Sequence, residues 1–255
     1  MKEILSTKNE LIKKVVKLHK RKYRYQERQY IIEGFHLIEE AVLHQSQIDY
    51  LFVTSKALAQ YGDWFNEQTI EVIVVSEEVL QKLSDLPTPQ GMLAVVAMPM
   101  QPTTLKKGNW LLLDCVQDPG NVGTMIRTAD AAGFAGVILG EGCADIYTTK
   151  TLRSMQGSQF HLPVIQLSLK QAIEQLRTLN VTIYGTELNE QAVQYHQLPM
   201  QENFALLMGN EGQGLAKEYL ALTDQNIYIP IFGQAESLNV AIAAGILMYG
   251  LTIKK

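Results

Sequence analysis

Short apolar runs alternate with amphipathic segments over the first hundred residues of the chain. Apolar runs of about this length, rich in β-branched and aromatic residues, are typical of strands, and apolar positions three and four apart are typical of helices. The expected strands span 30–32, 48–55, 70–76 and 91–98, and the expected helices span 33–44, 57–67 and 77–84. This alternation predicts a small α/β domain.

A second alternating region follows a segment without periodicity, residues 99–109, which contains prolines and threonines and is expected to be a linker. Strands are expected at 110–116, 136–140, 162–165 and 181–187, and helices at 121–132 and 169–179. The stretches 204–215 and 227–250 then read as strand, glycine-rich turn, short helix, strand, polar loop and long apolar helix. The region 110–255 therefore predicts a second α/β domain, built on a parallel sheet.

Small and polar residues follow several of these strands. Parallel strands end at a common edge, and ligands of open α/β sheets bind there. The loop after residue 208 is rich in glycine, and Asn121, Ser237 and Asn239 stand where they would cap helices. The sequence therefore predicts a ligand site formed by these loops, although capping alone would also explain the polar residues.

The first thirty residues differ in charge from the rest. They hold ten Lys or Arg and three Glu, a net +7, whereas the whole chain is −4, so the other 225 residues carry −11. We expect residues 1–29 to form a basic helical arm before a domain at 30–98, and such an arm favours an anionic polymer as partner. A solvated surface helix would explain the same charges. Tyrosines alternate with cations here, as in proteins that bind RNA. The candidate RNA contacts are Lys13, Lys17, Arg21 and Arg24, together with a second basic patch at Lys150 and Arg153.

Composition excludes several classes. A hydrophobic content of 47% with 19% charged residues is that of a folded protein. The two cysteines provide no disulfide framework and fit a reducing compartment, so we expect a cytoplasmic protein. The longest apolar run, 238–253, is shorter than a membrane span, so we expect no membrane association. The histidines lack the spacing of metal ligands, so no metal site is expected.

The chain contains neither a P-loop nor a GxGxxG motif after the strand at 110–116, and it has no GxSxG elbow. Three stretches instead resemble, in order and spacing, the motifs of the SpoU (TrmH-like) RNA 2′-O-ribose methyltransferases of the SPOUT superfamily. They are DPGNVGTMIRTADAAGF, LLMGNEGQGL and IPIFGQAESLNVAIAAG. The small domain also resembles the ribosomal-protein-like substrate-binding domain that some members carry, and the basic arm resembles their N-terminal extension.

The resemblance implies a parallel sheet with an α/β trefoil knot, S-adenosylmethionine held in the knot, and a homodimer formed through the apolar C-terminal helix. It places cofactor contacts at Thr186, Gly209, Asn210, Ile229 and Leu238. It places catalytic roles at Arg127, Asn121, Glu211, Ser237 and Asn239.

Arg127 is expected to clamp an RNA phosphate and to orient the 2′-hydroxyl. The family mechanism makes this arginine a general base, but a guanidinium has a pKa above about 12 and stays charged in proteins. A neighbouring phosphate would favour the charged form still more. We therefore expect Arg127 to be essential as a cation.

The substrate expected from the basic arm and the small domain is a large structured RNA, with 23S rRNA favoured over tRNA. A tRNA 2′-O-methyltransferase remains an alternative, as does an RNA-binding or ribosome assembly factor without catalytic activity. An α/β enzyme that uses another nucleotide is a third alternative, which the missing phosphate-binding motifs disfavour.

Overall fold

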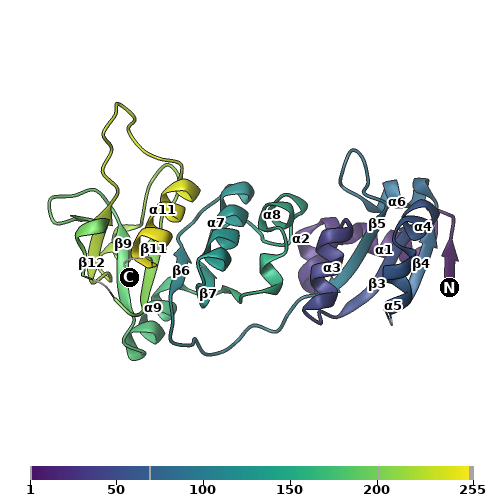
Figure 1. Cartoon of the computed structure of the whole chain (residues 1–255), viewed down its shortest axis with the longest axis horizontal. Coiled ribbons are helices and arrows are strands. Elements are labelled where there is room, and N and C mark those ends of the chain that lie inside the picture. The colour runs from purple at the N-terminus through teal and green to yellow at the C-terminus, as the bar shows by residue number, and fades with distance from the viewer. Residues whose placement is uncertain (1, 69, 200, 253–255) are drawn as a thin grey trace. The chain divides into compact units, whose positions relative to one another are not determined.

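The computed structural model describes residues 2–68, 70–199 and 201–252. The chain forms two compact units, and they do not follow the sequence strictly (Figure 1). The first unit contains residues 1–100 together with 147–152, and the second contains 101–146 and 153–255.

The first unit is built on a five-stranded mixed sheet in the order β1-β4-β3-β5-β2. Strands β1, β4 and β3 run parallel, whereas β5 is antiparallel to both β3 and β2. The predicted α/β alternation is therefore present. In chain order the elements are β1 (Lys2–Ile4), α1 (Glu10–Val16), the 3₁₀ turn η1 (Lys17–His19), α2 (Arg21–Glu27), β2 (Gln29–Glu33), α3 (Phe35–Leu43), β3 (Ile48–Thr54), α4 (Ser55–Gln60), α5 (Gly62–Glu67), β4 (Val72–Val75), α6 (Glu77–Leu83) and β5 (Met92–Ala97).

The basic N-terminal segment is part of this unit and not a separate arm. Strand β1 extends the sheet beside β4, and Ile12, Val15 and Leu18 are buried in one core with residues of α6 and the sheet. The basic helical segment expected within residues 1–29 is not one helix, because Lys20 takes an extended conformation between η1 and α2. Charge alone predicted an arm, but the apolar side of the same residues needs a core to cover it.

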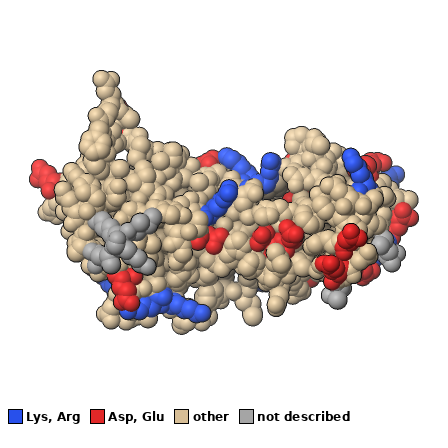
Figure 2. Space-filling model, viewed as in Figure 1, with Lys and Arg blue, Asp and Glu red and all other residues tan. Residues whose placement is uncertain are grey.

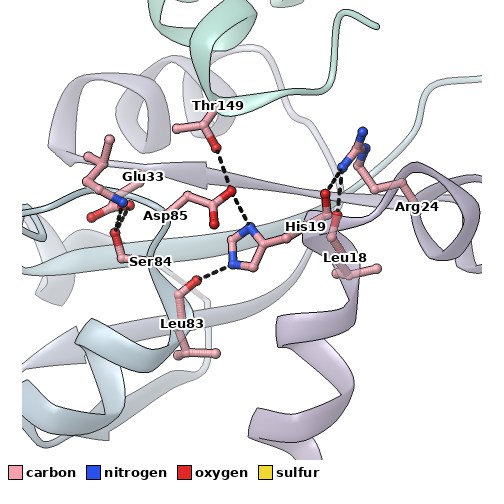
Figure 3. Close-up of polar contacts among 9 residues, drawn as sticks. Leu18, His19, Arg24, Glu33, Leu83, Ser84, Asp85 and Thr149 are labelled. Carbon is pink, nitrogen blue, oxygen red and sulfur yellow. Dashed lines mark hydrogen bonds and ion pairs between the residues drawn. The ribbon is translucent and has the colours of Figure 1, made fainter.

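Arg24 does not fit the predicted RNA contact, because only 4% of it is exposed. Its guanidinium donates to the carbonyl oxygens of Leu18 (2.9 Å) and His19 (2.7 Å), which ties α2 to η1 (Figure 3). The His19 ring in turn contacts the Leu83 carbonyl and the Asp85 carboxylate, each at 2.8 Å. These contacts fasten the N-terminal helices to the end of α6.

Residues 147–152 complete the first unit although they come from the later part of the chain. The ring of Tyr147 lies 4.6 Å from that of the buried Tyr30 and meets Tyr25 edge-on at 6.3 Å. The Thr149 hydroxyl donates to Asp85 at 3.5 Å (Figure 3). The sequence pattern did not predict this placement, because it marked the stretch only as a basic patch at Lys150 and Arg153.

The second unit contains a seven-stranded sheet in the order β10-β12-β9-β11-β6-β7-β8, and its neighbouring strands are parallel wherever the described residues pair. This confirms the predicted parallel sheet, and β10 is a strand that the pattern did not predict. The elements of the chain after the linker are β6 (Trp110–Leu113), α7 (Pro119–Ala131), β7 (Gly136–Leu139), α8 (Thr149–Met155), η2 (Ser158–Phe160), β8 (Val164–Gln166), α9 (Leu169–Thr178), β9 (Thr182–Thr186), β10 (Val193–Gln194), η3 (Tyr195–Gln197), β11 (Phe204–Met208), α10 (Lys217–Leu220), β12 (Gln225–Tyr228) and α11 (Val240–Thr252). All belong to the second unit except the first four residues of α8, which are part of the first.

The segment expected to be a linker is anchored to this unit at its end. Leu105 is buried in the core and its N–H donates to Gln175 at 3.2 Å, while the Trp110 indole donates to the Lys106 carbonyl at 2.9 Å. Helices α7 and α11 pack against each other. Within the described residues, no helix is both long enough and apolar enough to span a bilayer.

Candidate active site

Four neighbouring strands of the second unit end at the loops that carry the predicted site. In the order β12-β9-β11-β6 they are adjacent in the sheet, and all run parallel. Their carboxyl ends therefore lie along one edge. The loops after β6, β11 and β12 hold the three motifs, and β9 ends at Thr186. The sheet thus brings together segments more than a hundred residues apart.

The loop after β11 is held tightly. The Asn210 side chain donates to the Cys115 carbonyl at 2.8 Å and accepts from the backbone of Gly212 (2.9 Å) and Gln213 (3.1 Å). The backbones of Asn210 and Gly214 are also paired. A Cβ at Gly209 would lie 2.2 Å from the carbonyl carbon of Gly214, so the loop closes only with glycine there.

Glu211 connects this loop to the start of α7. Its carboxylate accepts from the backbone N–H groups of Gln117 (3.3 Å) and Asp118 (3.2 Å), and from the Asn121 side-chain amide (3.1 Å). Burial opposes ionisation of Glu211, but these hydrogen bonds and one from its own backbone outweigh it, so the pKa of the carboxyl is lowered. Glu211 is thus held as a carboxylate beside a helix N-terminus, where negative charge is favoured.

The cap of α7 is Asp118 and not Asn121, contrary to the simple capping interpretation. The Asp118 carboxylate accepts from the Asn121 N–H at 2.9 Å, and Pro119 takes the first helical position. An aspartate followed by proline is a sequence signal of a helix start, so the helix begins two residues before the expected residue 121. Because Asp118 provides the cap, the Asn121 side chain is available for contacts outside its own helix.

Asn239 brings in the third motif. Its oxygen accepts from the N–H groups of Ala241 (2.9 Å) and Ile242 (3.2 Å), which caps α11, and its amide donates to the Asn121 oxygen at 3.1 Å. Glu211, Asn121 and Asn239 therefore form one hydrogen-bonded chain, which we call the polar network. Its three members come from the three motifs.

A cavity of about 570 Å³ lies next to this network, where β9 and β12 end. Ser237 and Leu238, the two residues before Asn239, are part of its wall. The wall combines apolar side chains with a few polar ones, as small-molecule sites do. The lining residues are Thr186, Glu187, Leu188, Gln194, Ile227, Tyr228, Ile229, Pro230, Ile231, Gly233, Ala235, Glu236, Ser237, Leu238, Ala243 and Leu247.

Comparison with known families decides what this arrangement is. The model of the SpoU rRNA methylase family matches residues 109–249, which include all three motifs and every residue of the polar network. The chain belongs to the SpoU family. A second model, the MRM3-like substrate binding domain, matches residues 9–94, so this match includes much of the segment that charge had set apart as an arm.

Similar proteins cover nearly the whole chain. The chain is 44% identical over 251 residues to the 23S rRNA (guanosine(2553)-2′-O)-methyltransferase RlmP of Bacillus subtilis, covering 98% of this chain and 99% of that protein. A solved AdoMet-bound rRNA methyltransferase from Sinorhizobium meliloti is 30% identical, with a TM-score of 0.87 and coverage of 98% and 97%. The SpoU methyltransferase AviRb from Streptomyces viridochromogenes, also solved with AdoMet, is 26% identical, with a TM-score of 0.85 and coverage of 96% and 97%.

The cavity fits the cofactor of the SpoU family, S-adenosylmethionine. Its volume lies within the range of roughly 300–1,000 Å³ typical of small-molecule sites. Three of the five predicted cofactor contacts, Thr186, Ile229 and Leu238, line it. Gly209 and Asn210 are not among the lining residues and instead hold their loop together, so their contact with the cofactor stays a prediction.

The remaining catalytic candidates stand apart from the polar network. Ser237 lines the cavity, and Arg127 lies exposed on α7 two turns after Asn121. Within the described residues of this single chain, Arg127 has no hydrogen-bonding or ion-pair partner. Thr128 beside it packs near Gly245 of α11, since a Cβ at Gly245 would lie 3.7 Å from the Thr128 methyl group. The Arg127 guanidinium is therefore exposed near the surface where α7 meets α11.

The other predicted RNA contacts are exposed. Lys13 pairs with Glu10 at 2.7 Å, and Lys17 lies 5.7 Å from the centre of the Tyr23 ring. Arg21 lies over the Tyr25 ring at 5.2 Å. Lys150 and Arg153 are exposed on α8. On the face that Figure 2 shows, basic side chains are mixed with acidic ones, so the predicted contacts stay a prediction of individual residues.

Sequence reasoning missed several residues that shape the site. The buried Asp114 accepts from the Ala216 N–H at 2.9 Å and fixes the far end of the β11 loop. Cys115 takes a left-handed conformation (φ 52°), which directs its carbonyl to Asn210. Leu188 and Gln194 line the cavity from a segment without motif character. Only Asp114 had a signal, as a charged residue at the end of an apolar strand.

Proposed function

We propose that this protein transfers the methyl group of S-adenosylmethionine to a ribose 2′-hydroxyl of 23S rRNA. The observation that carries the proposal is the polar network, which joins Asn121, Glu211 and Asn239 beside a cavity of suitable size. Similarity to an rRNA methyltransferase over 98% of the chain supports the choice of substrate. A cytoplasmic location, where ribosomes are made, follows from the same proposal.

The protein's own residues position the reactants. Bound S-adenosylmethionine supplies a methyl group activated by its sulfonium, so the enzyme must orient the ribose hydroxyl, accept its proton and hold the RNA backbone. Arg127 binds the phosphate next to the target ribose as a permanent cation. The polar network joins the β11 loop, the start of α7 and the end of the β12 loop, and Ser237 lines the cavity wall where the cofactor would bind.

We further propose that the target is a guanosine, at the position equivalent to guanosine 2553 of the Bacillus subtilis relative. The similarity extends through both units, so the substrate-binding unit and the methyltransferase unit are both shared with that protein. A change of target would require differences in the surface that selects the nucleotide.

We also propose the homodimer and the trefoil knot that the resemblance implies. Ile242, Ile246 and Tyr249 are exposed apolar residues spaced three to four apart on α11, so they form one face of that helix. A second copy of the chain would cover this face and bring a second Arg127-bearing helix to the assembly. Sedimentation tests the homodimer. A dimeric wild type with a monomeric Ile246→Glu variant would support it, and a monomeric wild type would contradict it.

The proposed function is tested by removing the gene and mapping 2′-O-methyl groups on total RNA. We expect one lost site in 23S rRNA, restored by the wild-type gene and not by Arg127→Ala. A lost site in tRNA would favour the tRNA alternative. Unchanged methylation of all RNA, together with the absence of label transfer from tritiated S-adenosylmethionine to rRNA, would favour a non-catalytic assembly factor.

A further inference from the structure

The loop between β12 and α11, residues 229–239, exposes an aromatic side chain that the proposed mechanism does not use. Phe232 is 96% exposed. Burying a phenylalanine side chain stabilises a protein or a complex by roughly 1.5–3 kcal/mol. An exposed phenylalanine beside the candidate active site is therefore suited to contact a ligand. The loop extends away from β12 and α11 (Figure 1) and forms a narrow projection on the space-filling surface (Figure 2).

Phe232 belongs to an apolar rim around the cavity. Its neighbours in the chain, Ile231 and Gly233, line the cavity, whereas Phe232 itself is not among the lining residues. Leu188 and Leu238 line the same cavity and are also exposed. The Phe232 ring is therefore exposed to solvent next to the cavity wall and lies outside the space that the cofactor would fill.

The loop is free to adjust to a ligand. Among the described residues, 229–238 have no hydrogen bond or ion pair, and the first fastened residue is Asn239. A Cβ at Gly233 would meet nothing within 4 Å, so there is space next to Phe232. The loop is thus fixed at Asn239, and Phe232 belongs to the part that no hydrogen bond holds.

The chemistry of the loop favours a nucleobase as the ligand. Residues 229–239 contain no Lys or Arg, and Glu236 is their only charged residue, so the loop offers no cation to an RNA phosphate. An aromatic face stacks on an unpaired base without needing charge. We propose that Phe232 stacks on a base at the methylation site, and so positions the target nucleotide over the cavity. This inference rests on the proposed function and adds a positioning residue to it.

Three substitutions at one position test the proposal, with undermethylated 23S rRNA from a deletion strain as substrate. Stacking on one base is worth about a 5- to 150-fold change in affinity. We expect F232A and F232L to weaken RNA binding and raise the KM for RNA by that factor. F232Y, which keeps a π face, should stay within about threefold of wild type. Calorimetry with S-adenosylhomocysteine should give the same affinity for all four proteins.

The opposing outcomes are distinct. RNA affinity unchanged in F232L, with an active wild type, overturns the inference and leaves the proposed function standing. Loss of S-adenosylhomocysteine affinity alone would make Phe232 part of the cofactor wall, and dissociation of the F232A dimer in sedimentation would make it a subunit contact; either result overturns the inference. A wild type that methylates no rRNA overturns the proposed function, and the inference with it.

Discussion

The loops after β11 and β12 are both parts of the site, yet they are built differently. In the β11 loop, residues 209–215, Asn210 and Glu211 together make six side-chain hydrogen bonds within the loop and to the segment after β6. In the β12 loop, residues 229–238 make none with the described residues. One loop is held by its own side chains, and the other is held only at the end where Asn239 joins the polar network.

This difference separates two tasks. A site needs fixed groups to hold reacting atoms in place, and it needs an adjustable entrance through which a large substrate can bind. The β11 loop serves the first task by fixing Glu211 against the start of α7. We propose that the β12 loop serves the second, since several of its residues line the cavity and none is held by a hydrogen bond to the described residues. Neither loop contains a cation, and we propose that Arg127 supplies the positive charge that binds the phosphate.

The largest effect is expected from Arg127, because no residue of either loop can replace its charge. Loss of a preorganised group that stabilises the reacting charge costs about 10²–10³ in rate. We expect Arg127→Ala to reduce kcat for rRNA methylation by that factor, and Arg127→Lys to restore only part of it, since lysine lacks the planar fork. Single-turnover methylation measures both. Near-normal rates in either variant would contradict the assigned role.

A smaller effect, on stability, is expected from a pair of glycine substitutions that contrasts the two loops. The Cβ of Gly209→Ala would lie 2.2–2.4 Å from backbone atoms of Gly214 and Leu215, which must move. We expect a loss of about 1–3 kcal/mol in the free energy of unfolding. Gly233→Ala is the matched control, because its Cβ meets nothing within 4 Å. Denaturant unfolding should rank the two clearly, and equal losses would show that the β12 loop is as tightly packed as the β11 loop.

The smallest effect concerns the pH dependence of stability through Glu211. Its folded pKa is lowered, so its contribution is present above the pKa of the unfolded state and is lost as pH falls through the folded pKa. Because the side chain is exposed, we expect a contribution below about 1 kcal/mol. Wild type should be more stable than Glu211→Gln at pH 7, and the difference should shrink as pH falls below the unfolded-state pKa of about 4.3. A difference independent of pH would mean that the carboxylate charge is not what fastens the loop.

The sequence predicted most of the second unit because its signals are local. Apolar runs gave the strands β6, β7, β9 and β11, and the loops that follow parallel strands gave the edge where the site lies. The first unit was predicted less well at its start. The charge of residues 1–29 led to the prediction of a separate arm, whereas the burial of Ile12 and Leu18 makes that segment part of the first unit.

Individual residue roles were harder to predict than the site as a whole. Arg24 looked like its basic neighbours, but its guanidinium is used by the carbonyls of Leu18 and His19. Asn121 was predicted to cap the helix that follows the first strand of the second unit, but the structure has Asp118 as the N-cap of α7. In both cases the sequence lists the donors and acceptors, and only the path of the backbone decides which of them meet.

The order of motifs along the chain was enough to predict the family, the cofactor and the parallel sheet, because each motif is a short local pattern. The tertiary structure alone decided that Glu211, Asn121 and Asn239 form one hydrogen-bonded chain, and that residues 147–152 belong to the first unit. It also decided that Phe232 is exposed beside the cavity. Contacts between distant segments depend on strand order and on burial, and these are properties of the folded chain as a whole.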